Sequence, residues 1–430
     1  MTFQATDSQS VFVLIWTITM TIRPLELKQD FAAVRRIWEE IGWIDRNDDD
    51  DAKYLRKFLK GSRTLAAELA GAVECTVSSC DGTILHQQAE LSMAVIAAVT
   101  TSTVARKQGL ASQLTARVVA QEAESGMATA ALGMFEQGYY SRLGFGTGPY
   151  ERFVKLNPAL INIDVDFRPP LRLTQKHAAD LYQALMQRWR GHGGTQVASV
   201  KHVEAEMGWT EEPLGLGYRD EEGKLTHFVW GRCKGEYGPF HIHALAYQNR
   251  QQLLELMALL KSLGDQIVLV TLFEPQHVQL QDLIRQPFRN QRKTEGGKYE
   301  EGIKAEAWWQ LRINDLATCI AATHLSNHST LSLNLTLDDP IRHHLDSSQP
   351  WQGISGEYTL HLGQECKVSA GHSKNLPQLN ASVGGFSRLW LGAASATRLA
   401  TSGDVTAADD LIENLDRVFL LPTPATGWQF

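Results

Sequence analysis

The chain has 430 residues and a net charge of −7, with 43% hydrophobic and 21% charged residues. These values are typical of a globular protein of roughly two to four domains. The negative charge gives no electrostatic reason to bind nucleic acid, and it fits a cationic substrate better than an anionic one. Five scattered cysteines without a C-x-x-C pair favour a reducing, cytoplasmic environment.

The first predicted element is preceded by an apolar run at residues 11–20. Residues 1–10 contain no Lys or Arg, so this run does not match a secretory signal. It is also too short to span a bilayer, and we expect no membrane association. We interpret residues 1–19 as an N-terminal extension.

Residues 20–156 are predicted to form a first α/β domain, because segments with strand and helix periodicity alternate there. An acidic run at residues 45–51 interrupts them, and we interpret it as a solvated loop or helix start. A sharper hypothesis is that this run borders an amine-binding cleft. The predicted strands are residues 21–25, 65–75, 89–99, 129–134 and 153–156, and the predicted helices are residues 27–41 and 108–124.

Residues 157–305 repeat the order of strand, helix and strand, and residues 306–430 form a third predicted domain. The loop before the second domain's main helix, residues 246–250, has no glycine. We therefore expect this copy to keep the scaffold without a phosphate-binding turn. The remaining predicted strands are residues 160–170 (with a linker), 214–219, 227–233, 240–247, 266–272, 331–337, 356–362 and 365–370; the predicted helices are residues 174–188, 203–207, 251–263, 384–391 and, in part, 404–419.

The most informative motif is the turn Arg106-Lys107-Gln108-Gly109-Leu110-Ala111, which lies between a predicted strand and a predicted helix. Glycine lets the backbone approach an anion closely, and a helix N-terminus carries unpaired N–H groups and positive charge. The Tyr139-Tyr140 pair follows the next predicted strand and offers a proton donor. The combination predicts acyl transfer from a pyrophosphate-bearing carrier such as coenzyme A.

These motifs resemble the GNAT superfamily of acyl-CoA-dependent N-acyltransferases, and the whole order resembles the enhanced-intracellular-survival (Eis-like) acetyltransferases. The resemblance implies tandem GNAT-like α/β domains with mixed, mostly antiparallel sheets, of which the second is degenerate. A sterol-carrier-protein-like α+β domain would follow, giving an α+β protein overall. Thr103 departs from the pattern, since proline is usual there. The matching segments are residues 99–111, 136–146, 309–316 and 379–392, with Pro424, Trp428 and Phe430 in the tail.

The resemblance implies direct transfer of an acetyl group from acetyl-CoA to a primary amine. By resemblance, Tyr140 is the general acid beside the sulfur, with Tyr139 as its rival, and the α-carboxylate of the last residue, Phe430, is the general base. The alternative for Tyr140 is a purely structural role as a buried, hydrogen-bonded tyrosine, and the alternative for Phe430 is that the chain end is frayed. The residues expected to bind the carrier are Val99, Thr101, Arg106, Lys107, Gln108, Gly109, Ala111 and Ser112.

The acceptor stays open between an aminoglycoside or polyamine-like molecule and a lysine side chain. Gln429 is neutral where an acidic residue can occur in aminoglycoside-acetylating relatives, which weakens attraction to a polycation. The family resemblance also implies a hexamer. We expect no metal, because His241 and His243 lack an evident third ligand and the His343-His344 pair is similar.

A non-catalytic alternative is a lipid carrier or scaffold that uses the sterol-carrier-like domain. Thiol release from acetyl-CoA with an amine would favour the enzyme, whereas lipid extracted with the purified protein would favour the carrier.

Overall fold

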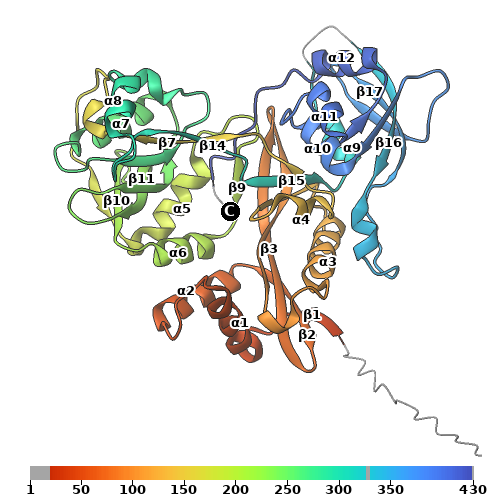
Figure 1. The fold of residues 1–430 in the computed structure, drawn as a ribbon, viewed down its shortest axis with the longest axis horizontal. Coiled ribbons are helices and arrows are strands. Elements are labelled where there is room, and N and C mark those ends of the chain that lie inside the picture. Colours follow the sequence, from red (N-terminus) through yellow and green to blue (C-terminus); the bar gives the residue numbers. More distant parts are fainter. Residues whose placement is uncertain (1–19, 326–329, 429–430) are drawn as a thin grey trace, which may run out of the picture.

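The computed structural model describes residues 20–325 and 330–428, and within them the chain forms three β-sheets flanked by helices (Figure 1). Most neighbouring strands run antiparallel, which confirms the predicted α+β class. The first sheet has the strand order β1-β2-β3-β4-β5-β15-β6, with β9 paired to β3. Its strands are β1 (Met20–Pro24), β2 (Arg63–Leu69), β3 (Ala72–His86), β4 (Ala89–Thr101), β5 (Thr129–Gly133), β6 (Gly146–Thr147), β9 (Thr195–Val197) and β15 (Trp309–Ile313).

Helices cover both faces of the first sheet. Helix α3 (Leu110–Glu124) packs Leu114 and Val118 into an apolar cluster with strand residues such as Ile96. Helices α1 (Leu27–Ile41) and α2 (Asp49–Lys60) form another cluster, which includes the half-buried Ala97 of β4. Since neighbouring strand residues point to opposite faces, β4 contributes to a core on each side. Helix α1 has the bounds that its apolar periodicity predicts.

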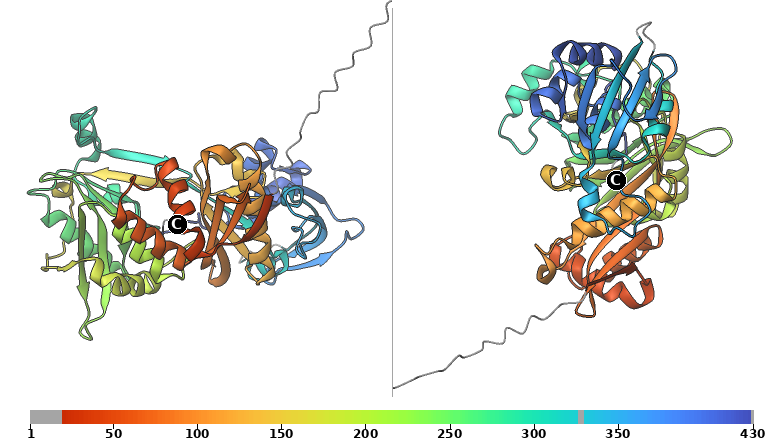
Figure 2. Two further views of the ribbon diagram at one scale, coloured as in Figure 1. Left: turned by 90° about the horizontal axis from the view of Figure 1, so that it is seen from below. Right: turned by 90° about the vertical axis from the view of Figure 1, so that its right-hand side faces the viewer.

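The second sheet has the order β14-β7-β13-β12-β11-β10-β8, and the third has the order β18-β17-β16-β19-β20. The first sheet lies between the other two, as both Figure 1 and Figure 2 show. The strands are β7 (Glu151–Leu156), β8 (Leu171–Leu173), β10 (Pro213–Arg219), β11 (Leu225–Cys233), β12 (Phe240–Ala246), β13 (Val270–Phe273), β14 (Gly302–Glu306), β16 (Leu331–Asp338), β17 (Gly356–Leu362), β18 (Lys367–Ala370), β19 (Gln378–Ser382) and β20 (Val405–Thr406).

Of the remaining helices, the one at residues 137–141 packs with the first sheet, and the others flank the second and third sheets (Figure 1). The helices at residues 137–141, 287–294, 316–321 and 396–402 were not predicted. Helix α6 is longer than the predicted residues 203–207, because the Ser199 side chain caps it by accepting a hydrogen bond from the backbone of His202. These helices are α4 (Gln137–Ser141), α5 (Ala178–Gln187), α6 (Val200–Trp209), α7 (Arg250–Ser262), α8 (Pro287–Thr294), α9 (Leu316–Ala321), α10 (Val383–Trp390), α11 (Ala396–Ser402) and α12 (Asp409–Val418).

The first two sheets exchange strands, which the sequence did not predict. We expected residues 153–156 to close the first domain, but β7 pairs with β13 and β14 of the second sheet. Strand β15, expected to open the third domain, pairs instead with β5 and β6 of the first sheet. Strand periodicity predicts a strand and its buried face but not its neighbours, so these two assignments were wrong. The interlocked strands make the sheets mutually dependent.

Two further predictions need correction. Residues 65–75 are not one strand, because the chain turns at Ala70 and Gly71, which have φ angles of +53° and +84°. Consecutive positive φ angles are typical of a tight hairpin turn. Residues 160–170 hold no strand and contribute one isolated bridge, between Ile161 and Ile284. The predicted extension at residues 1–19 lies outside the described residues.

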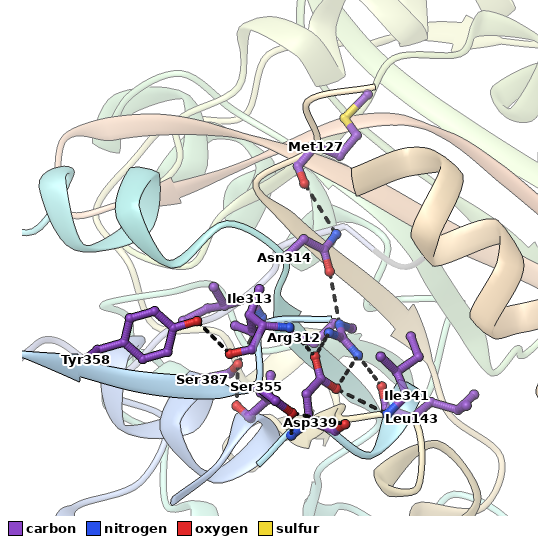
Figure 3. Close-up of polar contacts among 12 residues, drawn as sticks. Met127, Leu143, Arg312, Ile313, Asn314, Asp339, Ile341, Ser355, Tyr358 and Ser387 are labelled. Atoms are coloured by element: carbon purple, nitrogen blue, oxygen red, sulfur yellow. Dashed lines mark hydrogen bonds and ion pairs between the residues drawn. The ribbon is translucent and has the colours of Figure 1, made fainter. Parts of the chain in front are cut away.

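A buried ion pair joins the first sheet to the third. Arg312 on β15 donates to Asp339, 2.7 Å away, and both side chains are fully buried (Figure 3). Arg312 also donates to the carbonyl oxygen of Leu143 and to Asn314. Asp339 accepts from the backbone of Ile354 as well. Because each charge has several partners, the cost of removing the pair from water is offset.

Two glycines of the tyrosine motif lie against this junction. Gly144 has a φ angle of +78°, and a Cβ atom there would lie 2.8 Å from Arg312 Nη1 and 2.9 Å from Asp339 Oδ1. A Cβ atom at Gly146 would lie 2.1 Å from the carbonyl oxygen of Gly384 on α10. The motif that carries Tyr140 therefore has its shape set by contact with the C-terminal part of the chain.

We expect Asp339→Ala to lower the free energy of unfolding by about 3–5 kcal/mol, because it leaves the Arg312 guanidinium buried without its counter-charge. The matched control is Asp338→Ala, since Asp338 is exposed and lies 3.4 Å from Arg342. The control should change the free energy by about 0.5 kcal/mol or less. Urea denaturation measures both variants. Equal losses in the two would show that the buried pair does not hold the sheets together.

Candidate active site

Strands β4 and β5 separate partway along their length. They pair in parallel from Met93 and Thr129 to Ile96 and Leu132, and β5 ends at Gly133 while β4 continues to Thr101. Beyond Ile96, β4 pairs only with β3 among the described strands. Its backbone therefore presents unpaired groups on the side that β5 has left, and these groups are able to bind an extended ligand as a strand would.

A β-bulge lies where the two strands part. Thr100 and Ala97 of β4 oppose Thr76 and Ser78 of β3, so β4 holds one extra residue in this interval. Ala98 within the bulge has a φ angle of +50°, which is uncommon for a residue with a Cβ atom. A bulge bends its strand and increases its twist. The bulge thus widens the gap between β4 and β5.

The predicted carrier turn follows β4 directly. Lys107 and Gly109 have φ angles of +62° and +77°, and α3 begins at Leu110 rather than at the predicted Gln108. Residues 106–109 are exposed, and no side chain caps α3. The first N–H groups of the helix and two cationic side chains, Arg106 and Lys107, are thus available to an anion. By contrast, the Asn249 side chain caps α7 in the second sheet by accepting from Gln252, 3.1 Å away.

The two motif tyrosines lie on the α3 side of the first sheet. Tyr140 on α4 is 2% exposed and packs in the same cluster as Ile96 and Leu114. Burial raises the pKa of its phenol well above the usual value, so the hydroxyl keeps its proton. Tyr139 is half-buried, and its ring stands perpendicular to the Tyr140 ring.

The hydroxyl groups of these tyrosines differ in their partners. Ser112 Oγ donates to Tyr139 Oη at 3.2 Å, so the hydroxyl that we expected at the carrier is directed to Tyr139. Among the described residues, the Tyr140 hydroxyl forms no hydrogen bond. This difference leaves Tyr140 free to donate to a bound ligand.

A cavity of about 220 Å³ lies on the opposite face of β4, between the first and second sheets and the end of the chain. Val95 and Ala97 form its β4 wall, whereas Ile96 between them packs on the α3 side. Much of the lining is aromatic or aliphatic. The main apolar residues are Phe58, Leu181, Leu185, Trp189, Val197, Val203, Met207, Trp230, Ile242, Tyr247, Phe273, Trp308 and Trp428.

The last described residues of the chain form part of this cavity. Glu151 accepts hydrogen bonds from Thr426 N at 3.0 Å and Oγ1 at 3.2 Å. Arg188 and Thr195 both donate to the Thr426 carbonyl oxygen, and the Arg188 guanidinium lies 5.2 Å from the centre of the Trp428 ring. The chain is therefore docked, not frayed, up to Trp428. Phe430, the predicted base, lies outside the described residues.

The pKa values of two charged groups in the cavity wall are shifted by their surroundings. The buried Arg188 guanidinium has no carboxylate partner among the described residues, and burial lowers its pKa to about 9. Glu206 lines the cavity as an exposed residue of α6, and partial desolvation by the surrounding walls raises the pKa of its carboxyl group to about 6. Sequence reasoning missed Arg188, Glu206 and the tail-binding Glu151, because none belongs to a motif and the fold alone brings them together.

The other sequence candidates lie apart from this site or have structural partners. Asp48 caps α2, so the acidic run at residues 45–51 is a helix start, and none of its residues lines the cavity.

His241 bonds to Thr271, while His243 is at the cavity wall. Within residues 20–325 and 330–428, no group of His, Cys, Asp and Glu is arranged to hold a metal ion. No helix there has the length and apolar character to cross a bilayer.

The first and last parts of the chain each match a known domain family. Residues 21–148 match the family model for an acetyltransferase (GNAT) domain. The chain is an acyltransferase with a GNAT domain. Residues 332–427 match the family model for a sterol carrier protein domain, which confirms the prediction for the C-terminal region. No curated protein matches the chain.

Solved structures share the fold along nearly the whole GNAT acyltransferase chain. A probable N-acyltransferase from Enterococcus faecalis V583 has 14% identity and a TM-score of 0.76, covering 96% of this chain and 100% of that one. A GCN5-related N-acetyltransferase from Kribbella flavida has 19% identity and a TM-score of 0.72, with coverage of 96% and 99%. Eis1 from Mycobacterium abscessus has 15% identity and a TM-score of 0.74, with coverage of 96% and 100%. Membership of the Eis-like family stays a prediction.

Proposed function

We propose that the protein transfers an acetyl group from acetyl-CoA to a primary amine. One observation carries this proposal: the gap between β4 and β5 opens after Ile96, on the strand that leads into the exposed turn at residues 106–109, and Val95 and Ala97 on the other face of β4 line a cavity. A carrier on one side of the sheet would thus deliver its thioester to an acceptor on the other. The acceptor is an aminoglycoside-like or polyamine-like small molecule, or a lysine side chain.

The carrier would bind through backbone groups and two cations. The N–H groups of residues 106–112 would hold the pyrophosphate of acetyl-CoA, with Arg106 and Lys107 adding charge. Backbone groups of Val99 and Thr101, beyond the last pair between β4 and β5, would bind the pantetheine arm. The positive φ angle at Gly109 supports this assignment, because it directs the turn into the uncapped end of α3.

The transfer needs one proton donor and one proton acceptor. The amine nitrogen attacks the thioester carbonyl, a carbon–nitrogen bond forms, and the carbon–sulfur bond breaks. Tyr140 would donate a proton to the leaving sulfur, since its raised pKa keeps the phenol protonated and its hydroxyl has no hydrogen bond to a described residue. Tyr139 is the rival donor, but its hydroxyl already bonds to Ser112.

The proton from the amine would go to the α-carboxylate of Phe430. An α-carboxyl group has a pKa of about 3.5 in water, and burial beside an apolar wall raises it. The docking of Thr426 and Trp428 at the cavity supports this role, because two residues span at most about 7 Å of chain.

From the family resemblance we also propose a hexamer and a cytoplasmic location.

Mixing the protein with acetyl-CoA and a panel of primary amines should release free thiol and yield acetylated amine, as followed by a thiol reagent and mass spectrometry. Thiol release should depend on the amine, because transfer is direct. Hydrolysis of acetyl-CoA at the same rate without any amine would contradict an amine acceptor.

Replacing Tyr140 with Phe should lower kcat by about 10²–10⁴-fold, the usual contribution of a general acid, while coenzyme A binds as before. Tyr139→Phe is the matched control, and it should retain most of the activity. Steady-state kinetics and calorimetric binding of coenzyme A measure the two effects. If the control loses more turnover than Tyr140→Phe, the roles of the two tyrosines are reversed.

Adding one alanine after Phe430 should reduce kcat by about 10²-fold or more, because the carboxylate moves by one residue. The protein should still fold and bind coenzyme A. Amidation of the terminal carboxyl group by semisynthesis keeps the chain length and removes only the charge, so it should cause the same loss. Full activity in either form would exclude the terminal carboxylate as the base.

A further inference from the structure

Glu206 is the unexplained charge in the cavity. It lies on α6, with Val203 and Met207 of the same helix also lining the cavity. Its carboxylate makes no hydrogen bond or ion pair to any described residue, although its backbone carbonyl accepts from Thr210. Its neighbour on the helix, Glu204, instead pairs with Lys57 and Lys201 on the outside of the cavity.

The other described carboxylates and arginines of the cavity wall already have partners. Glu151 and Glu274 both accept hydrogen bonds, while Arg188 donates to backbone carbonyls and Arg190 pairs with a carboxylate. Glu206 is therefore the one described carboxylate of the wall left to bind a cation. Glu151 accepts from Thr426 and from two tryptophans. Glu274 accepts from Arg152 and from the backbone N–H of Leu280, and Arg190 pairs with Glu90.

The remaining walls suit an apolar molecule. Trp230, Trp428 and Phe58 contribute aromatic faces, and Leu185 and Ile242 contribute aliphatic surface. At about 220 Å³ the cavity is smaller than the ~300–1,000 Å³ typical of sites for drug-sized ligands. Among the described residues, the wall offers one unpaired carboxylate and much apolar contact, so a polycation with several sugar rings would leave most of its charges unpaired.

We propose that the acceptor is a small primary amine with a single ammonium group on an aryl or alkyl body, and that Glu206 binds this ammonium. The inference rests on the proposed acetyltransferase function and narrows its acceptor class. Glu206 determines binding and specificity, and it is distinct from the base that takes the proton.

The charge state of Glu206 fits this role. Above a pH of about 6 the carboxylate is ionised and exposed, with no counter-charge from the described residues. A ligand that fills the cavity covers this charge, which is costly unless the ligand pairs with it. A bound ammonium supplies the missing counter-charge and hydrogen-bond donor. A neutral ligand of the same shape would leave the carboxylate unpaired, so the cavity discriminates in favour of the cation.

Steady-state kinetics on the full chain test the assignment with 2-phenylethylamine and hexylamine against spermidine and kanamycin. The two monoamines should have the higher kcat/KM. Glu206→Gln should raise their KM by about tenfold to a hundredfold with kcat little changed, the range expected when a charge-assisted hydrogen bond is lost. Glu204→Gln is the matched control on the same helix and should leave KM unchanged.

A binding measurement separates this inference from the proposed function. Without acetyl-CoA, 2-phenylethylamine should raise the melting temperature of the wild type and of Glu204→Gln, but not that of Glu206→Gln. No acetylation of any amine would refute the proposed function, whereas amine acetylation with an unchanged KM in Glu206→Gln would refute only this inference. A preference for kanamycin or spermidine, or a loss confined to kcat, would also overturn it.

Discussion

The buried pair of Arg312 and Asp339 is the constraint on which the arrangement of the site depends. It connects a strand of the first sheet to the segment that follows β16, and the same guanidinium bonds to the Leu143 carbonyl oxygen. Because an unpaired charge in this position would be strongly destabilising, the three segments must meet in one geometry. The short helix that carries Tyr140 lies just before Leu143, so its position depends on residues more than 160 positions away in the chain.

A second junction completes the site from the far end of the chain. The Glu151 carboxylate holds Thr426 and the indole N–H groups of Trp308 and Trp309 at once. One acidic side chain thereby fastens the tail to the start of β7 and to the segment entering β15. The exchanged strands and the docked tail together explain why the GNAT unit is not a separate module here. The sterol-carrier-like region supplies one side of the buried ion pair and the tail that reaches the cavity.

The sequence predicted the parts of the site that depend on local chemistry. The glycine turn at residues 106–111 and helix α1 follow from short-range patterns, and the turn lies where the periodicity predicts it. The short helix that carries the two tyrosines was not predicted. The loop before α7 was expected to lack the phosphate-binding turn, and Asn249 does cap that helix. In contrast, the sheet membership of β7 and β15 and the isolation of Glu206 are set by contacts between distant segments. Hydrophobic alternation and secondary-structure propensity are local properties of the sequence, so they do not predict such contacts.

A structure of the protein with coenzyme A bound tests the central claim most directly. The account predicts the pyrophosphate against the backbone of residues 106–112 and the thiol in the gap between β4 and β5. It further predicts the Tyr140 hydroxyl within hydrogen-bond distance of the sulfur and the carboxyl group of Phe430 at the cavity. Coenzyme A bound elsewhere, or a chain end directed away from the cavity, would contradict it.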